Sequence, residues 1–175
     1  TPTRSSAASD VYKRQGDKDN ILLATRLGKA IRFDVHDVRV FVGRGSSGVR
    51  GIRLKPNDYV VSMSLIPNLE NRFILSVTEN GFGKRTPIDD YRMTNRGGQG
   101  VANIECSERN GPVVASYVAS EDDQIMLVTN SGKLIRIRVH GGEGDSIRVA
   151  GRKTQGVRLF DVDEGEKVVS VALLS

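Results

Sequence analysis

The sequence is poor in the residues that build metal sites, disulfides and aromatic surfaces. It has one cysteine, two histidines and no tryptophan, with only five phenylalanines and four tyrosines. A single cysteine cannot form an intrachain disulfide, and His36 and His140 lie too far apart for the ligand spacing of a zinc site. The few aromatic residues also argue against a surface that stacks on single-stranded nucleic acid.

Long apolar runs and familiar catalytic motifs are missing as well. No apolar run exceeds about five residues, whereas a membrane-spanning helix needs ~20. Residues 43–48 have the glycine spacing of a phosphate-binding loop, but Val49 stands where such a loop requires lysine. The chain has no Gly-x-Ser-x-Gly elbow. We therefore expect no catalytic residues in this chain, no metal or cofactor site and no membrane segment.

The formal net charge is small once the first residues are set aside. Residues 1–16 have no periodicity and no landmark in common with the rest, so we interpret them as a non-native or disordered leader. They supply +2 of the formal +5, which leaves +3 on the remaining chain. Net charge is thus weak evidence for a nucleic-acid partner, and the placement of the charges has to be considered.

A unit of ~50 residues recurs three times after the leader. Each copy opens with an apolar run followed by a turn glycine and an arginine; the runs are residues 21–25, 74–78 and 125–129. Each copy then has the motif Arg-x-x-x-Gly-Val, here called the box, at residues 44–49, 96–101 and 152–157. A short apolar block closes each copy, at residues 60–62, 113–115 and 168–170. We place the units at about 17–68, 69–120 and 121–175.

The start of each unit predicts a β-hairpin. Asn80-Gly81 is a strong hairpin signal because a tight primed turn needs positive φ, which these residues tolerate. Gly28 and Gly132 occupy the matching position in the other units. The turn is therefore a repeated device.

Beyond each box, apolar and charged residues alternate. Two aligned columns are apolar, one with Ile52, Ile104 and Phe160 and the other with Leu54, Cys106 and Val162. A period of two predicts a half-buried strand after each box. Cys106 is then interpreted as a small buried hydrophobic residue and not as a reactive thiol.

Short strands at this period indicate an all-β, propeller-like array of four-stranded antiparallel blades. Each blade would bury its faces against its neighbours. The third unit contains an extra segment, residues 140–146, which we expect to be a surface loop. Three blades are fewer than the four to eight typical of a closed ring, so we expect a fragment of a larger ring, or an arc.

Several strings resemble the C-terminal domain of the bacterial DNA gyrase A subunit. They are residues 79–86 (ENGFGKRT), 107–111 (SERNG), 123–126 (DQIM) and 151–157 (GRKTQGV). The resemblance runs from about Asn20 to Ser175. It implies a β-pinwheel, a propeller-like disc of about six blades in which neighbouring blades exchange strands, and this chain would hold about three of them.

The resemblance also implies a function. The domain would bind duplex DNA without catalysis and wrap it around a basic rim, in support of ATP-dependent negative supercoiling by a type IIA topoisomerase. The parent enzyme would assemble with ATPase B subunits and with a second A subunit, in the bacterial cytoplasm and associated with the nucleoid.

One string departs from the family pattern. The family's signature is the heptapeptide Gln-Arg-Arg-Gly-Gly-Lys-Gly in the first blade, whereas residues 94–100 here read TNRGGQG. This string resembles the degenerate box of later blades. We therefore expect that the chain lacks the blade with the full signature, and also the breakage-reunion region with its catalytic tyrosine.

Wrapping needs many phosphate contacts and no reading of base edges. Arginine suits this task because its planar fork can hold two phosphate oxygens. Arginines recur after each turn glycine and at the start of each box, with further cations beside them. The expected DNA-binding residues are Lys29, Arg32, Arg44, Arg50, Arg53, Lys84, Arg85, Arg96, Lys133, Arg136, Arg138, Arg152, Lys153 and Arg158.

Three alternatives stay open. On pattern alone, the arginines fit equally well as solvated strand faces paired with some of the 21 acidic residues. Within the resemblance, the C-terminal domain of the topoisomerase IV homologue of this gyrase chain would carry similar blades without the signature. A propeller-like scaffold for protein partners is a rival of another class and predicts an exposed apolar patch.

Overall fold

The computed structural model describes residues 19–67, 71–142 and 146–175, and its regular elements are strands apart from two short 3-10 turns. The predicted leader and part of the predicted loop at 140–146 lie outside the described residues. The first unit holds β1 (Asn20–Thr25), β2 (Lys29–Asp34), η1 (Val35–Asp37) and β3 (Val60–Ile66). The second holds β4 (Phe73–Thr78), β5 (Phe82–Pro87), η2 (Ile88–Asp90), β6 (Val101–Ala102) and β7 (Val113–Ala119). The third holds β8 (Gln124–Thr129), β9 (Leu134–Arg138), β10 (Val157–Arg158) and β11 (Val168–Leu174).

Each unit opens with the predicted hairpin. β1 pairs with β2, β4 with β5 and β8 with β9, all antiparallel. The turn glycines Gly28, Gly81 and Gly132 have φ of 87°, 80° and 85°. A side chain is strained at such angles, which explains why glycine recurs at this position.

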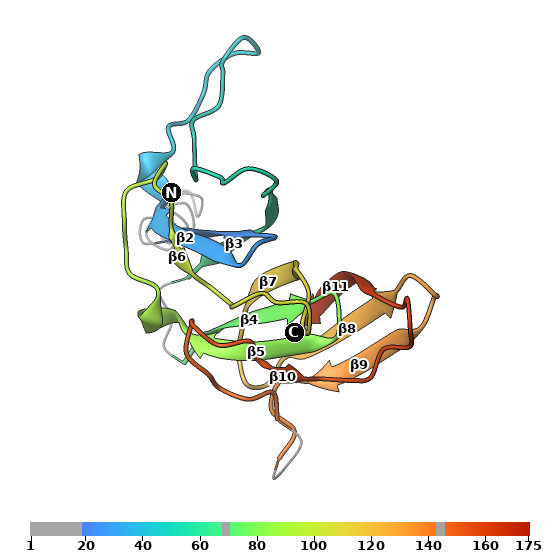
Figure 1. Ribbon diagram of the computed structural model, residues 1–175. Helices are drawn as coiled ribbons and strands as arrows, with labels where there is room; N and C mark the ends of the chain where they lie inside the picture. Colours follow the sequence, from blue (N-terminus) through green and yellow to red (C-terminus); the bar gives the residue numbers. More distant parts are fainter. Residues whose placement is uncertain (1–18, 68–70, 143–145) are drawn as a thin grey trace, which may run out of the picture.

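The outer strand of a sheet comes from the following unit. The first sheet has the order β3-β1-β2-β6, in which β6 belongs to the second unit. The second has the order β10-β5-β4-β7, in which β10 belongs to the third unit. The all-β, propeller-like architecture with exchanged strands is thus confirmed (Figure 1).

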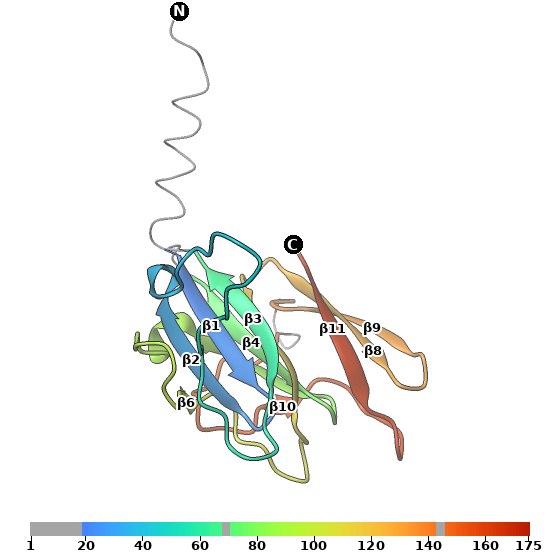
Figure 2. The same ribbon diagram turned by 90° about the horizontal axis from the view of Figure 1, so that it is seen from above.

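The sheets pack side by side through their closing strands, since β3 contacts β7 and β7 contacts β11 (Figure 2). The largest core cluster joins units, because Leu75 and Val77 of β4 pack with Ile125 and Leu127 of β8. All four of these side chains are at most 1% exposed. Burial between blades, as predicted from the repeat, therefore stabilises the array.

The third sheet differs from the expectation of four strands. It has three, in the order β11-β8-β9. Because the fourth strand of the other sheets is donated by the next unit, β9 has no such partner among the described residues. In the first unit, the region between Val38 and Tyr59 has no strand at all.

The segments after the boxes are also less regular than predicted. The strands there are two residues long, and the backbone N–H of the following Asn103 and Leu159 donates to the turn carbonyls of Gly28 and Gly81, at 2.8 Å each. The alternation thus marks burial and not a long ladder: Ile104 is buried, and Cys106 is half-buried. Burial raises the pKa of the Cys106 thiol, as expected for an inert cysteine.

Candidate nucleic-acid interface

The sheet order places the box segments on the outside of the array. Strands β3, β7 and β11 face one another, while β6 and β10, which include the last residue of their boxes, form the opposite sheet edges. The same placement occurs in both four-stranded sheets. An outward row of boxes is therefore a consequence of the strand exchange (Figure 2).

The box arginines contact the preceding unit. Arg96 donates from Nη1 to the carbonyl oxygen of Arg50 at 3.1 Å, and Arg152 donates from Nη1 to that of Ala102 at 3.0 Å. Arg50 and Ala102 are aligned, each directly after the box valine of its unit. Both arginines are half-buried. They fasten one box to the next and leave only part of each guanidinium for an outside ligand.

The arginines after the turn glycines make a second repeated contact. Arg32 donates from Nη1 to the carbonyl oxygen of Tyr91 at 3.1 Å, and Arg85 donates from Nε to that of Ile147 at 2.7 Å. Tyr91 and Ile147 are aligned residues of the following unit. Desolvation lowers the pKa of Arg32, and nearby Asp89 opposes this shift. These arginines hold blades together.

Lys84 is buried at 0% exposure, between the second sheet and the third box. Its Nζ donates to the carbonyl oxygens of Gly151 and Arg152 and to Oγ1 of Thr154. Burial, and secondarily the charge of Arg152, lowers the pKa of the Lys84 ammonium from 10.5 to about 8. The aligned residues are Ile31 and Ile135, so the lysine occupies an apolar column.

Two expected phosphate ligands are therefore corrected. Lys84 is fully buried and Arg85 is only 6% exposed, because the box of the third unit covers both. A buried cation cannot reach a DNA phosphate. The repeat alignment showed where these residues stand along the chain, but it did not show which strand of the next unit lies over them.

The other expected cations differ in how free they are. Lys29 is half-buried, and Lys133 is exposed but ion-paired with Asp163 and Glu166 at 2.5 and 3.1 Å. Hydrogen bonds, first from the backbone of Asp163, lower the pKa of Glu166 to about 2. The remaining members are exposed: Arg44, Arg50, Arg53, Arg136, Arg138, Lys153 and Arg158.

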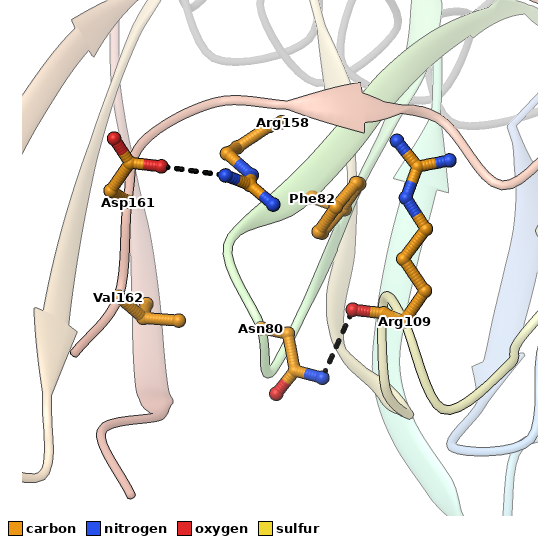
Figure 3. Close-up of a pocket in the computed structure, with 6 residues that line it drawn as sticks. All are labelled: Asn80, Phe82, Arg109, Arg158, Asp161 and Val162. Carbon is orange, nitrogen blue, oxygen red and sulfur yellow. Dashed lines mark hydrogen bonds and ion pairs between the residues drawn. The ribbon is translucent and has the colours of Figure 1, made fainter. Parts of the chain in front are cut away.

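A small hollow at the outer edge brings together two exposed arginines from different units (Figure 3). The guanidinium carbons of Arg109 and Arg158 lie 5.0 and 5.5 Å from the centroid of the Phe82 ring. The hollow has a volume of about 190 Å³ and is also lined by Asn80. Asp161 pairs with Arg158 at 2.9 Å. Cations held over an aromatic face keep a defined position, which suits a phosphate contact.

Arg109 was missed as a candidate from the sequence. It has no counterpart in the repeated arginine positions, and its only signal was its place in the string 107–111. Within the described ranges, no group of His, Cys, Asp and Glu residues is arranged to hold a metal ion. Nor does any helix among the described residues have the length and hydropathy needed to cross a membrane.

The fold and the outward boxes define the chain as a strand-exchanging, propeller-like repeat array. Comparison with known sequences gives the family. The chain matches the family described as "DNA gyrase C-terminal domain, beta-propeller" over residues 19–67, 72–118 and 123–175. It belongs to this family, as the resemblance in its sequence implied.

The relatives agree with this assignment. The DNA gyrase A subunit of Rickettsia felis is 39% identical over 205 residues, covering 91% of this chain and 22% of the relative. The DNA gyrase A subunit of Chlamydia pneumoniae is 43% identical over 160 residues, covering 91% of this chain and 18% of the relative. The chain thus spans about a fifth of these curated relatives.

Two solved structures are similar in fold. The C-terminal domain of a DNA topoisomerase IV has a TM-score of 0.79 at 29% identity, with 90% of this chain and 47% of that chain covered. A DNA gyrase A C-terminal domain has a TM-score of 0.77 at 30% identity, with 91% and 51% covered. Both share the blade architecture with this chain.

Proposed function

We propose that this chain is a duplex-DNA binding and wrapping domain, which holds phosphates along the outer row of boxes. One observation carries the proposal: strand exchange puts the boxes of the second and third units at the same outer sheet edge, each with exposed cations nearby. Repeated cations along one edge give a track on which a duplex can bend. Bending by 40–90° over a short site costs about 1–6 kcal/mol, so several contacts are needed to offset it.

The proposed contacts differ from the set expected from sequence. We keep the exposed residues as the primary contacts: Arg44, Arg50, Arg53, Arg136, Arg138, Lys153 and Arg158, with Arg109 added. Lys29, Arg32, Arg96, Lys133 and Arg152 are secondary, because burial or protein partners occupy part of each charge. The blades at 17–68, 69–120 and 121–175 would each present one section of the track.

In the parent enzyme, the wrap would support ATP-dependent negative supercoiling. The relatives suggest an assembly of two A subunits with ATPase B subunits in the bacterial cytoplasm, on the nucleoid. The chain itself would contribute positioning of the DNA and no catalytic residue.

A salt series tests the DNA-binding proposal. Filter binding to mixed-sequence duplexes is measured for the wild type and for a variant with Arg44, Arg50, Lys153 and Arg158 all changed to Gln, here called the edge variant. Each lost phosphate contact should reduce the slope of log K against log salt by about 0.9. The control is Lys55→Gln with Lys167→Gln, which removes charges outside the boxes. Equal slopes for the edge variant and the wild type would contradict the proposal.

A topoisomerase IV domain is the second candidate, favoured by the similar TM-scores of the two solved structures. The two candidates differ in whether the wrap has a fixed hand. Ligation of nicked circular DNA with the bound domain should change the linking number in one direction for a gyrase-type wrap. Binding without a change in linking number would favour the topoisomerase IV type.

A further inference from the structure

Two sheet edges in this chain are closed in the same way. In the first, Ala30 of β2 pairs with Val101, and in the second, Gly83 of β5 pairs with Val157. The glycine just before each valine lies very close to the acceptor strand. A Cβ on Gly100 would come within 2.4 Å of the Ala30 carbonyl oxygen, and one on Gly156 within 2.7 Å of that of Gly83. Docking therefore requires glycine at this position.

The edge of β9 is the same kind of surface without its occupant. Leu134 is aligned with Ala30 and Gly83, which are buried, yet it is 69% exposed. Arg136 is aligned with Arg32 and Arg85 and is exposed, without the carbonyl contact that those residues make to the next unit. β9 thus presents unpaired backbone groups beside an apolar side chain.

The first box is the same kind of strand without its acceptor. Residues 39–54 align without gaps with residues 91–106 and 147–162, which dock on the preceding units. Val42 is 96% exposed, whereas the aligned Thr94 and Ala150 are half-buried. A Cβ on Gly48, the aligned glycine, would meet nothing within 4 Å. Gly48 meets the docking requirement, although nothing is docked there.

We propose that the two unmatched surfaces bind each other between two copies of this chain, with residues 41–53 of one copy on the β9 edge of the other. Val49 would then pair with Leu134, and Arg44 would donate to the carbonyl oxygen of Arg158 in the second copy, as Arg152 does to Ala102. We start the docked segment at Phe41 because Arg39 stands where the aligned Tyr91 and Ile147 are buried.

The size of the solved domains favours two copies. This chain covers 47% and 51% of the two similar structures, so two copies supply about as much chain as one such domain. A pair in which each copy donates once and accepts once leaves neither edge open, and the assembly closes as a two-fold ring. This inference goes beyond DNA binding and does not depend on it.

Light scattering and sedimentation of the 175-residue chain, without DNA, test the proposal. We expect a particle of twice the 19.1 kDa chain mass. Gly48→Val should weaken self-association by at least about 30-fold, as for an interface hot spot. It should leave the unfolding midpoint of the dilute monomer unchanged, since Gly48 has open space around it. The control Ser47→Val, at the neighbouring exposed position, should associate like the wild type.

A cysteine pair tests the register. In a Cys106→Ser background, Val49→Cys and Leu134→Cys placed on separate copies should oxidise to a mixed disulfide dimer, while Val42→Cys with Leu134→Cys should not. A strictly monomeric wild type would overturn the proposal. So would a monomer that binds a synthetic peptide of residues 39–54, because the edge would then be reserved for another repeat unit.

Discussion

The second and third sheets are built from aligned residues, but only the second is closed at its outer edge. On the second, the box of the following unit covers β5, so that Lys84 and Arg85 become interior residues. On the third, the aligned Ile135 and Arg136 of β9 remain half-buried and exposed. Whether one of these residues stabilises the fold or faces a ligand is thus decided by the next unit and not by its own.

The largest predicted difference concerns the apolar column under the outer strand. Ile31 is 1% exposed beneath the closed first sheet, whereas Ile135 is half-buried on the open third sheet. Ile31→Ala should lower the free energy of unfolding by about 3 kcal/mol, and Ile135→Ala by ~1 kcal/mol. Urea unfolding at a concentration that keeps the chain monomeric measures both. Equal losses would show that the two edges are covered alike.

The aligned arginines should separate stability from DNA binding. Arg85→Leu leaves the Ile147 carbonyl without its buried donor and should destabilise the fold by about 2 kcal/mol. Arg136→Leu should change stability by less than ~0.5 kcal/mol. It should instead reduce the salt slope of DNA binding by about 0.9. A stable Arg85 variant with a reduced salt slope would reverse this assignment.

The smallest effect is a pH dependence from Lys84. Its folded pKa of about 8 lies below the ordinary 10.5, so between these values the unfolded chain holds a proton that the folded chain has lost. Folding stability from this residue therefore rises with pH across that window, by on the order of 1 kcal/mol. Unfolding of wild type and Lys84→Met at pH 8 and pH 10 measures the difference. Parallel pH profiles for the two proteins would contradict it.

The sequence predicted the hairpins and the array because their causes are local. A glycine with positive φ sets each turn, and apolar runs of strand length flank it, as at Gly81 between β4 and β5. The repeat then fixed how many hairpins there are. Even the open outer edge follows from the count of units, once the strand exchange is known.

The roles of individual cations were not predictable in the same way. Arg32, Arg85 and Arg136 are identical in local sequence position, yet their surroundings depend on residues more than 50 positions away or absent from the chain. Likewise, Arg109 has no repeated counterpart and reaches Arg158 only because β10 crosses to the second sheet. Contacts between units decide both outcomes, and a single sequence does not display them.

The most direct test of the outer track is the bending of a duplex a few helical turns long, measured by energy transfer between dyes on its ends. We predict that the wild type brings the ends together at low salt and that the edge variant does not. Replacing the same four residues with charge-retaining Lys or Arg should preserve bending. Normal bending by the edge variant would contradict the claim that these boxes hold the DNA.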